Sequence, residues 1–211
     1  MSEIAGIETV LVQLPTRREH KWAGLTEPIG RYVLVRAVSE HGVVGWGEAP
    51  ALKDWGGEFG RYFGESPPIV ETVISNYLAP AVVGLDVGNI VAAHAQMDAV
   101  IKGYPYAKAA VEFALYDLAA RSMRQPVHML LGGRVRDRIP VTHSIGLLDI
   151  DEAVGLLQAV RGMNIVGGDI VCMMPTKDAP NQITALTATS IMFEMISMIA
   201  ENVKRKTEAN L

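Results

Sequence analysis

The sequence predicts an α+β fold in which a three-stranded antiparallel meander precedes a helical bundle. Two observations carry this prediction: valine-rich stretches separated by turn signals before residue 50, and apolar residues at helical spacing between residues 66 and 122. The composition agrees, because a chain of 211 residues with 49% hydrophobic and 20% charged residues is of ordinary globular type. Such a length accommodates one generous domain or two small ones.

The three expected strands lie close together in the sequence. Residues 4–14 alternate loosely between apolar and polar side chains, and residues 32–39 are rich in valine. Glu40-His41-Gly42 is typical of a tight turn, and it leads into a third strand over residues 43–48. Consecutive strands with a short connection favour an antiparallel meander.

Two long loops interrupt this part of the chain, over residues 15–31 and 50–68. Long connections in compact domains are often functional. The second loop has four glycines, and its aromatic residues are Trp55, Phe59, Tyr62 and Phe63. Either these aromatic side chains anchor the loop itself, or they form a lid over a pocket; the residues alone leave both open.

Helix signals follow from Ser66 onward. Ser66 is the expected N-cap, Pro67 the first helical residue and Pro80 the end of the first helix. Asn89 is expected to cap a second helix, on which His94 and Asp98 lie four residues apart. Two such residues are too few for a metal site, so we interpret them as a surface pair.

The longest helix signal begins after Tyr104. Alanine-rich positions recur at three- and four-residue steps until Gln125-Pro126 closes the helix. Gly132-Gly133 then favours a turn, and Ile139-Pro140-Val141 opens a strand. These features predict a junction between helical and α/β structure.

Charge and composition exclude several classes of protein. The net charge of −4 with no basic face argues against nucleic-acid binding. The single cysteine, Cys172, excludes an internal disulfide framework and fits a reducing cytoplasm. We see no signal peptide and no uninterrupted apolar run of about 18 residues, so we expect a cytoplasmic protein with no membrane contact.

Several motifs resemble a known family. The segments AKAAVEFALYDLAA, QPVHMLLGG and VRDRIPV, together with GVVGWGEAP at residues 42–50, resemble the enolase superfamily, in its mandelate racemase / muconate-lactonising branch. The resemblance covers roughly residues 4–154. It implies an α+β capping domain over residues 1–130 followed by an incomplete β/α barrel segment: a junction and first barrel strand and helix at 131–162, then a divergent strand and amphipathic helix at 163–211.

The resemblance also implies a chemistry and a set of substrate contacts. Relatives abstract a proton α to a carboxylate with Mg²⁺ as cofactor, acting as racemases, cycloisomerases or dehydratases on small carboxylates. Two loops of the capping domain help to select the substrate. The candidate substrate-binding residues at these positions are His20, Lys21, Trp22, Lys53 and Trp55. A lysine would suit a carboxylate substrate as a point charge.

The residues that would perform this chemistry are not found in the sequence. Where the second barrel strand should carry Lys-x-Lys, the chain has Met163 to Asp169, and the only Lys-x-Lys is Lys204-Arg205-Lys206 near the end of a helix. Asp169 and Asp178 are isolated carboxylates, and His143 is a lone histidine. The catalytic residues are therefore unknown. We expect no Mg²⁺ site and no catalysis from this chain alone, so whether it is an enzyme stays open.

The tail differs in composition from the family's barrel. A short strand is expected over residues 169–174, and hydroxyl residues are expected to precede a long apolar helix; they are Thr184, Thr187, Thr189 and Ser190. The order is faintly similar to phosphosugar-binding domains, although the hydroxyls equally suit helix caps. We interpret the tail as foreign to the barrel, through fusion, deletion or frameshift.

Three hypotheses for function remain. The chain is a truncated or rearranged member of the resembled family, or a non-catalytic binding or assembly module that docks through its exposed partial barrel, or a phosphosugar-binding protein through its tail. A partial barrel would expose strand edges and apolar faces. We therefore expect self-association or a partner chain.

Overall fold

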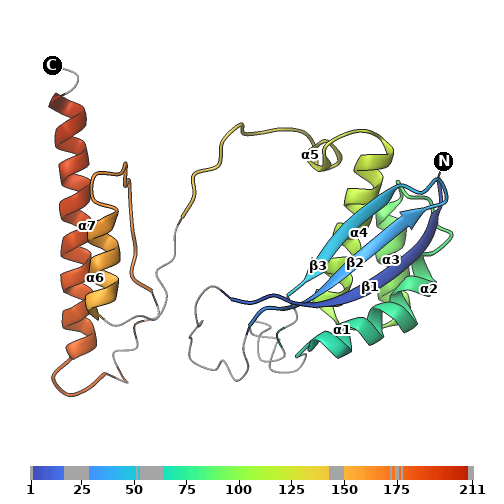
Figure 1. Ribbon diagram of the computed structural model, residues 1–211, viewed down its shortest axis with the longest axis horizontal. Coiled ribbons are helices and arrows are strands. Elements are labelled where there is room, and N and C mark those ends of the chain that lie inside the picture. The colour runs from blue at the N-terminus through green and yellow to red at the C-terminus, as the bar shows by residue number, and fades with distance from the viewer. Residues whose placement is uncertain are drawn as a thin grey trace. The chain divides into compact units, whose positions relative to one another are not determined.

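The computed structural model describes residues 2–16, 29–50, 52, 64–142, 150–171, 173, 176 and 178–208. The chain divides into two compact units, Met1–Thr142 and His143–Leu211. The first unit contains a sheet and a group of helices, and the described residues of the second contain two helices (Figure 1).

The sheet of the first unit is the predicted antiparallel meander. Its strands are β1 (Ile4–Gln13), β2 (Arg31–Ser39) and β3 (Val44–Ala49), in the order β1-β2-β3. The predicted tight turn joins β2 to β3, since the Gly42 N–H donates to the Ser39 carbonyl at 2.9 Å and Gly42 has φ +77°. This left-handed backbone favours glycine. Alternate residues of β2, from Val33 to Ser39, are buried.

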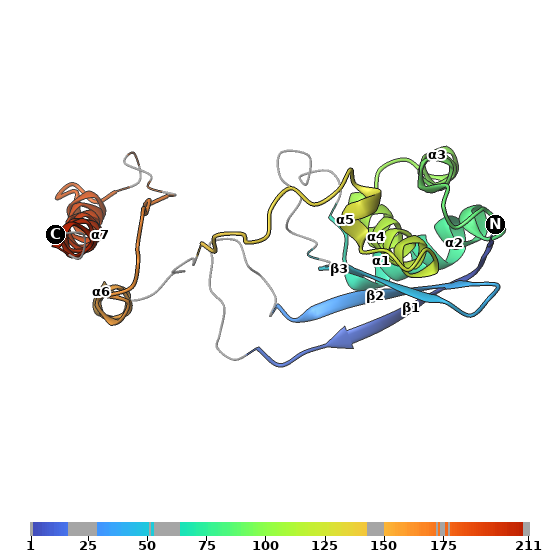
Figure 2. The same ribbon diagram turned by 90° about the horizontal axis from the view of Figure 1, so that it is seen from above.

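Helices cover one face of this sheet, while its other face is open (Figure 2). In chain order, the elements after β3 in this unit are α1 (Pro67–Val73), η2 (Ile74–Leu78), α2 (Ala79–Val82), α3 (Ile90–Val100), α4 (Pro105–Ser122) and α5 (Val127–Leu130). Asn89 caps α3 as predicted, since its Oδ1 accepts from the Ala92 N–H at 3.1 Å. The core forms where the inner face of the sheet meets α1, η2 and α4.

The first helix starts as predicted but does not end as predicted. Ser66 occupies the N-cap position and Pro67 opens α1, but the Ser66 side chain makes no capping hydrogen bond. Pro80 was expected to end the helix, and this is wrong: the chain passes through the π-helical turn η2 into α2, with Pro80 in the first turn of α2. A proline is tolerated there because first-turn amides lack intrahelical partners, and the wider π turn absorbs the irregularity.

Two glycines let α4 approach β3 closely. A Cβ atom on Gly47 would overlap the Ala110 carbonyl oxygen, and one on Gly45 would overlap the backbone of α4 at Ala114 and Leu118. The alanines of α4 supply the matching small surface, as their periodicity predicts. Asp117 of α4 also accepts the Trp46 N–H at 2.9 Å, so α4 satisfies an amide of the edge strand.

The second unit contains α6 (Ile150–Ala159) and α7 (Ile183–Glu208). Residues 140–142 and the described residues of 169–174 are not in strands, which corrects the strand predictions there; the rest of both segments lies outside the described residues. The described part of this unit has no neighbouring strand to pair with them, and a lone strand leaves its amides unpaired.

The hydroxyl residues were expected to precede the long helix, and this is wrong, because α7 includes them. It begins at Ile183, so Thr184 and Thr187 lie in its first turns. By length and composition α7 could also cross a membrane, although these two properties alone are weak grounds for a membrane span. The sequence has no uninterrupted apolar run over α7, because Glu194 and Glu201 lie within it.

Candidate functional site

The candidate site is the end of the sheet where the two long loops start and finish. Gln13 at the end of β1 pairs with Arg31 at the start of β2, and Val33 pairs with Ala49 at the end of β3. The antiparallel register therefore brings both ends of the first loop and the start of the second loop to one end of the sheet. The Leu14 N–H donates to the Gly30 carbonyl at 2.8 Å and closes the base of the first loop.

The five predicted substrate-binding residues lie on these two loops. They are His20, Lys21, Trp22, Lys53 and Trp55, and all five are outside the described residues. The structure therefore brings together the points from which their loops emerge, and it does not test the side chains themselves. Their roles stay predictions.

Glu65 anchors the end of the second loop. Its side chain is fully buried, and its two carboxylate oxygens accept the N–H groups of Tyr106 at 2.8 Å and Ala107 at 3.0 Å. These amides belong to the first turn of α4, where backbone N–H groups have no helical partner. A carboxylate there also opposes the positive end of the helix dipole.

Burial raises the pKa of Glu65, while the two backbone N–H groups and the nearby Lys108 ammonium act in the opposite direction. Because both oxygens are held by amides, the carboxylate is arranged for positioning and not for proton transfer. Sequence reasoning missed Glu65. The only available signal was a carboxylate between a glycine-rich loop and a proline-started helix, which does not reveal its partners.

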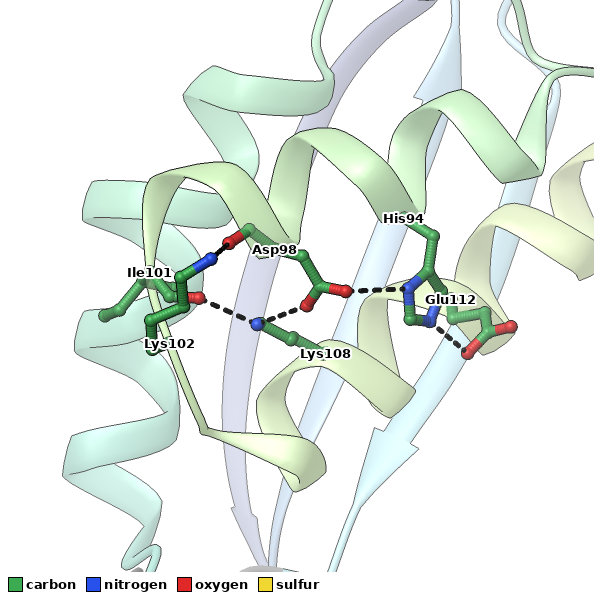
Figure 3. A network of polar contacts seen from close by, with 6 residues as sticks. All are labelled: His94, Asp98, Ile101, Lys102, Lys108 and Glu112. Carbon is green, nitrogen blue, oxygen red and sulfur yellow. Dashed lines mark hydrogen bonds and ion pairs between the residues drawn. The ribbon is translucent and has the colours of Figure 1, made fainter.

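A second polar cluster ties α3 to α4 (Figure 3). The Lys108 ammonium, 9% exposed, lies 2.6 Å from Asp98 Oδ1 and donates to the Ile101 carbonyl at 2.7 Å. His94 lies between two carboxylates, 3.7 Å from Asp98 and 3.2 Å from Glu112. The predicted pairing of His94 with Asp98 is confirmed, and Glu112 is a further partner that was not foreseen.

This cluster is a structural link between helices. The Lys108 ammonium, by its hydrogen bond and its charge, lowers the pKa of Asp98 and keeps that carboxylate ionised. A cation already occupies the Asp98 carboxylate, so His94, Asp98 and Glu112 do not form a metal site. In the part of the chain that the structure describes, no group of three His, Cys, Asp or Glu residues could hold a metal ion.

Two polar residues of the second unit that the sequence analysis considered, Asp178 and Lys204, also have structural partners. Asp178 caps α7, because its carboxylate accepts the N–H groups of Thr184 at 3.2 Å and Ala185 at 3.1 Å. A hydrogen bond from the Thr184 side chain is the largest cause of the lowered pKa of Asp178, and the backbone N–H groups act in the same direction. Lys204 forms an exposed ion pair with Glu208 at 3.8 Å, one turn further along α7. His143 lies outside the described residues.

Comparison with known proteins places this arrangement in a family. Residues 6–132 match the family model "Mandelate racemase / muconate lactonizing enzyme, N-terminal domain". The chain belongs to this family. Its curated relatives include "Chloromuconate cycloisomerase CbnB" of Cupriavidus necator, 35% identical over 165 residues, and "Muconate cycloisomerase 1" of Pseudomonas putida, 40% identical over 164 residues.

Solved structures of mandelate racemase / muconate lactonizing enzyme family proteins confirm the predicted fold class. A muconate lactonizing enzyme from Pseudomonas fluorescens complexed with muconolactone aligns at a TM-score of 0.68 and 35% identity, over 80% of this chain and 46% of that chain. The F329I variant of a muconate cycloisomerase aligns at 0.68 and 30% identity, over 93% of this chain and 50% of that one. The three-stranded sheet with its helices is the capping domain of these proteins.

The match is partial along the length of the relatives. Each of the two curated cycloisomerases named above matches over 75% of this chain, and this chain spans 42% of their length. Residues 142–197 match a second family model, "Arginase family". One chain therefore carries likenesses to two families. The second likeness covers most of the tail that we interpreted as foreign to the barrel, from residue 163 on, and it also covers residues 142–162, which we had interpreted as the family's first barrel strand and helix.

Proposed function

We propose that residues 2–142 form the substrate-selecting cap of a mandelate racemase / muconate lactonizing enzyme family protein. The observation that carries this proposal is that both loops emerge at the same end of the sheet. Glu65 fixes the end of the second loop to α4. Loops on a rigid scaffold are where binding residues commonly lie. His20, Lys21, Trp22, Lys53 and Trp55 are the proposed contacts.

The proposed substrate is a small carboxylate. Support comes from the relatives, whose names are muconate and chloromuconate cycloisomerases, and from the relative that is complexed with muconolactone. Lys21 and Lys53 would supply positive charge for a carboxylate group. The family reaction would be proton abstraction α to that carboxylate with Mg²⁺ stabilising the developing negative charge. We also propose a cytoplasmic location, on the single cysteine.

We further propose that this chain alone does not catalyse that reaction, because the sequence lacks Lys-x-Lys where the second barrel strand is expected. The test incubates the full chain with muconolactone and Mg²⁺ in D₂O and follows exchange at the carbon next to the carboxyl group by NMR. We expect no exchange above a sample without protein. Exchange that requires both the protein and Mg²⁺ would contradict this proposal.

The role as a cap is tested in a chimera. Residues 1–132 replace the matching segment of the Pseudomonas putida muconate cycloisomerase, and KM for muconate is measured. We expect turnover, and we expect Lys53→Ala in the chimera to raise KM about tenfold, the loss of one charge-assisted hydrogen bond. The matched control is Lys102→Ala, an exposed lysine just after α3 whose Nζ donates to the Asp98 backbone carbonyl at 2.8 Å, and this change should leave KM unchanged. A chimera whose KM ignores Lys53 would remove this assignment.

The other two hypotheses fare differently. Assembly is favoured by the exposed apolar side chains of α7. Phosphate binding by the tail is not carried further, because the Asp178 carboxylate already accepts the amides of Thr184 and Ala185 at the start of α7. A phosphate would have to compete with this fixed negative charge.

A further inference from the structure

Helix α7 has an exposed row of residues at regular spacing. The row recurs at alternating steps of three and four residues and all its members are exposed: Leu186, Thr189, Phe193, Ile196, Ala200, Val203 and Thr207. We call these seven residues the α7 seam. Leu186 is 60%, Phe193 68%, Ile196 58% and Val203 59% exposed. Large apolar side chains grouped in this way mark an interaction surface.

At Thr189 and Phe193 the α7 seam borders its own unit, since both residues line an open hollow together with Val154 of α6. The large side chains of the seam nevertheless stay more than half exposed. The buried residues of α7 are Ala188, Met198 and Asn202, which lie on the opposite side of the helix at 100° per residue. Asn202 donates to the carbonyls of Met163 at 2.7 Å and Ile165 at 3.1 Å. The unit therefore covers one face of α7 and, within the described residues, leaves most of the surface of the seam's large side chains uncovered.

A membrane fits α7 less well than a protein partner. Glu194 and Glu201 lie within the helix and share one cation, Arg161, at 3.9 Å and 3.4 Å. Carboxylates inside a membrane span carry a high cost. A partner that covers only the seam leaves these charges in water.

We propose that the α7 seam is a homodimer contact, in which α7 of a second copy packs antiparallel against it. Alternation of three and four residues is the spacing at which two helices interlock side chains, and identical helices satisfy it mutually. In the antiparallel register Phe193 meets Ile196 of the other copy, and Leu186 meets Val203. The small pair Thr189 and Ala200 then also meet, so the layers match in size.

Charge favours the antiparallel direction. Lys204, Arg205 and Lys206 end the helix, and a parallel pair would bring six such cations together. The antiparallel pair separates the two basic ends and places each beside the helix start that carries Asp178. The two helix dipoles are also opposed in this arrangement. This inference does not depend on the proposed function of residues 2–142.

The first test is sedimentation velocity on the full chain over a range of concentrations. We expect a dimer, and we expect the double substitution Phe193→Ser with Ile196→Ser to weaken its association at least about tenfold. The matched control is Val91→Ser with Phe113→Ser, two exposed apolar residues outside α7, at 82% and 57% exposure. A second seam variant, Leu186→Ser with Val203→Ser, guards against a fold defect in the first, and circular dichroism verifies the helix content of each.

The second test fixes the direction by oxidative cross-linking in a Cys172→Ser background. Leu186→Cys together with Val203→Cys should form a covalent dimer, whereas Leu186→Cys alone should not. These two positions are 17 residues apart on one helix, about 25 Å, so they cannot pair within a chain. A monomeric wild-type chain, an unaltered dimer in both seam variants, or cross-linking by Leu186→Cys alone would overturn the proposal. Co-flotation of the monomer with phosphatidylcholine vesicles would show instead that a lipid surface covers the seam.

Discussion

At the scale of single residues, one glycine and one glutamate determine how α4 packs in the first unit. Gly47 allows β3 to contact α4, since the Ala110 carbonyl of α4 lies so close that no side chain fits at this position. Glu65 is essential for anchoring, since its carboxylate joins residues 41 positions apart in the sequence. Neither residue belongs to a pattern that periodicity can detect.

Gly47→Ala should destabilise the first unit by about 1–3 kcal/mol, the usual cost of forcing extra volume into a packed interior. The measurement is urea unfolding followed by tryptophan fluorescence, which reports this unit because Trp22, Trp46 and Trp55 all lie within residues 1–142. Gly6→Ala is the matched control on β1, where an added Cβ meets nothing within 4 Å. Equal unfolding midpoints for the two variants would contradict the close approach of α4.

Glu65 should make stability depend on pH in a defined direction. Its pKa is raised in the folded state, so the folded protein binds this proton more tightly than the unfolded chain does. The contribution is then fully present below the unfolded pKa of about 4.5 and is lost as the pH rises through the folded pKa. We expect the unfolding free energy of the wild type, minus that of Glu65→Gln, to fall between pH 4 and pH 7. A constant or rising difference would show that the burial effect does not dominate.

At the scale of elements, side-chain hydrogen bonds link helices to other segments of the chain. Lys108 reaches from α4 to Asp98 and to the Ile101 carbonyl at the end of α3. Asn202 joins α7 to the irregular segment around Met163. A buried polar group needs such partners, because leaving it unsatisfied costs free energy.

Lys108→Met should return the pKa of Asp98 toward its usual value, because the Lys108 ammonium is the largest cause of its lowering. A depressed carboxyl pKa contributes stability that is present above the unfolded pKa and lost as the pH falls through the folded pKa. The wild type should therefore lose more stability than the variant on acidification to about pH 3. NMR titration of the Asp98 carboxyl carbon measures the shift. Lys102→Met is the control: Lys102 Nζ donates to the Asp98 backbone carbonyl and its charge is the smallest cause of the lowered pKa of Asp98, so this variant should shift that pKa less than Lys108→Met does.

At the scale of the whole molecule, the chain combines a family's capping domain with a segment of different likeness. Residues 6–132 match the mandelate racemase / muconate lactonizing enzyme model and residues 142–197 match the arginase family model. Metal-assisted chemistry needs carboxylates that several elements bring together. A metal site in this chain would therefore require carboxylates from several elements, so no single sequence motif can establish it.

Millimolar Mg²⁺ should leave the thermal unfolding midpoint of the full chain unchanged. A ligand that binds only the folded state raises this midpoint, and the described residues contain no cluster of three metal-ligating side chains. Differential scanning calorimetry with and without Mg²⁺ makes the comparison, with Ca²⁺ as a control for non-specific ionic effects. A rise with Mg²⁺ alone would reveal a cation site and contradict our expectation.

The sequence by itself determined the features that depend on neighbours along the chain. The three-stranded meander, the Ser66 and Asn89 N-caps, the turn at Gly42 and the alanine-rich face of α4 all follow from local spacing and backbone preference. The family resemblance follows from the same contiguous residues. The helix boundary at Pro80 failed because a π turn depends on how the helix packs, which propensity does not encode.

Only the tertiary structure decided which distant residues meet. Strand register brought both loops to one edge, burial placed the Glu65 carboxylate on α4, and the crossing of α3 and α4 set Glu112 beside His94. These contacts join positions between 16 and 42 residues apart, and their existence depends on the path of the chain through space. Local sequence specifies elements because its interactions are short in range; sites form where those elements converge.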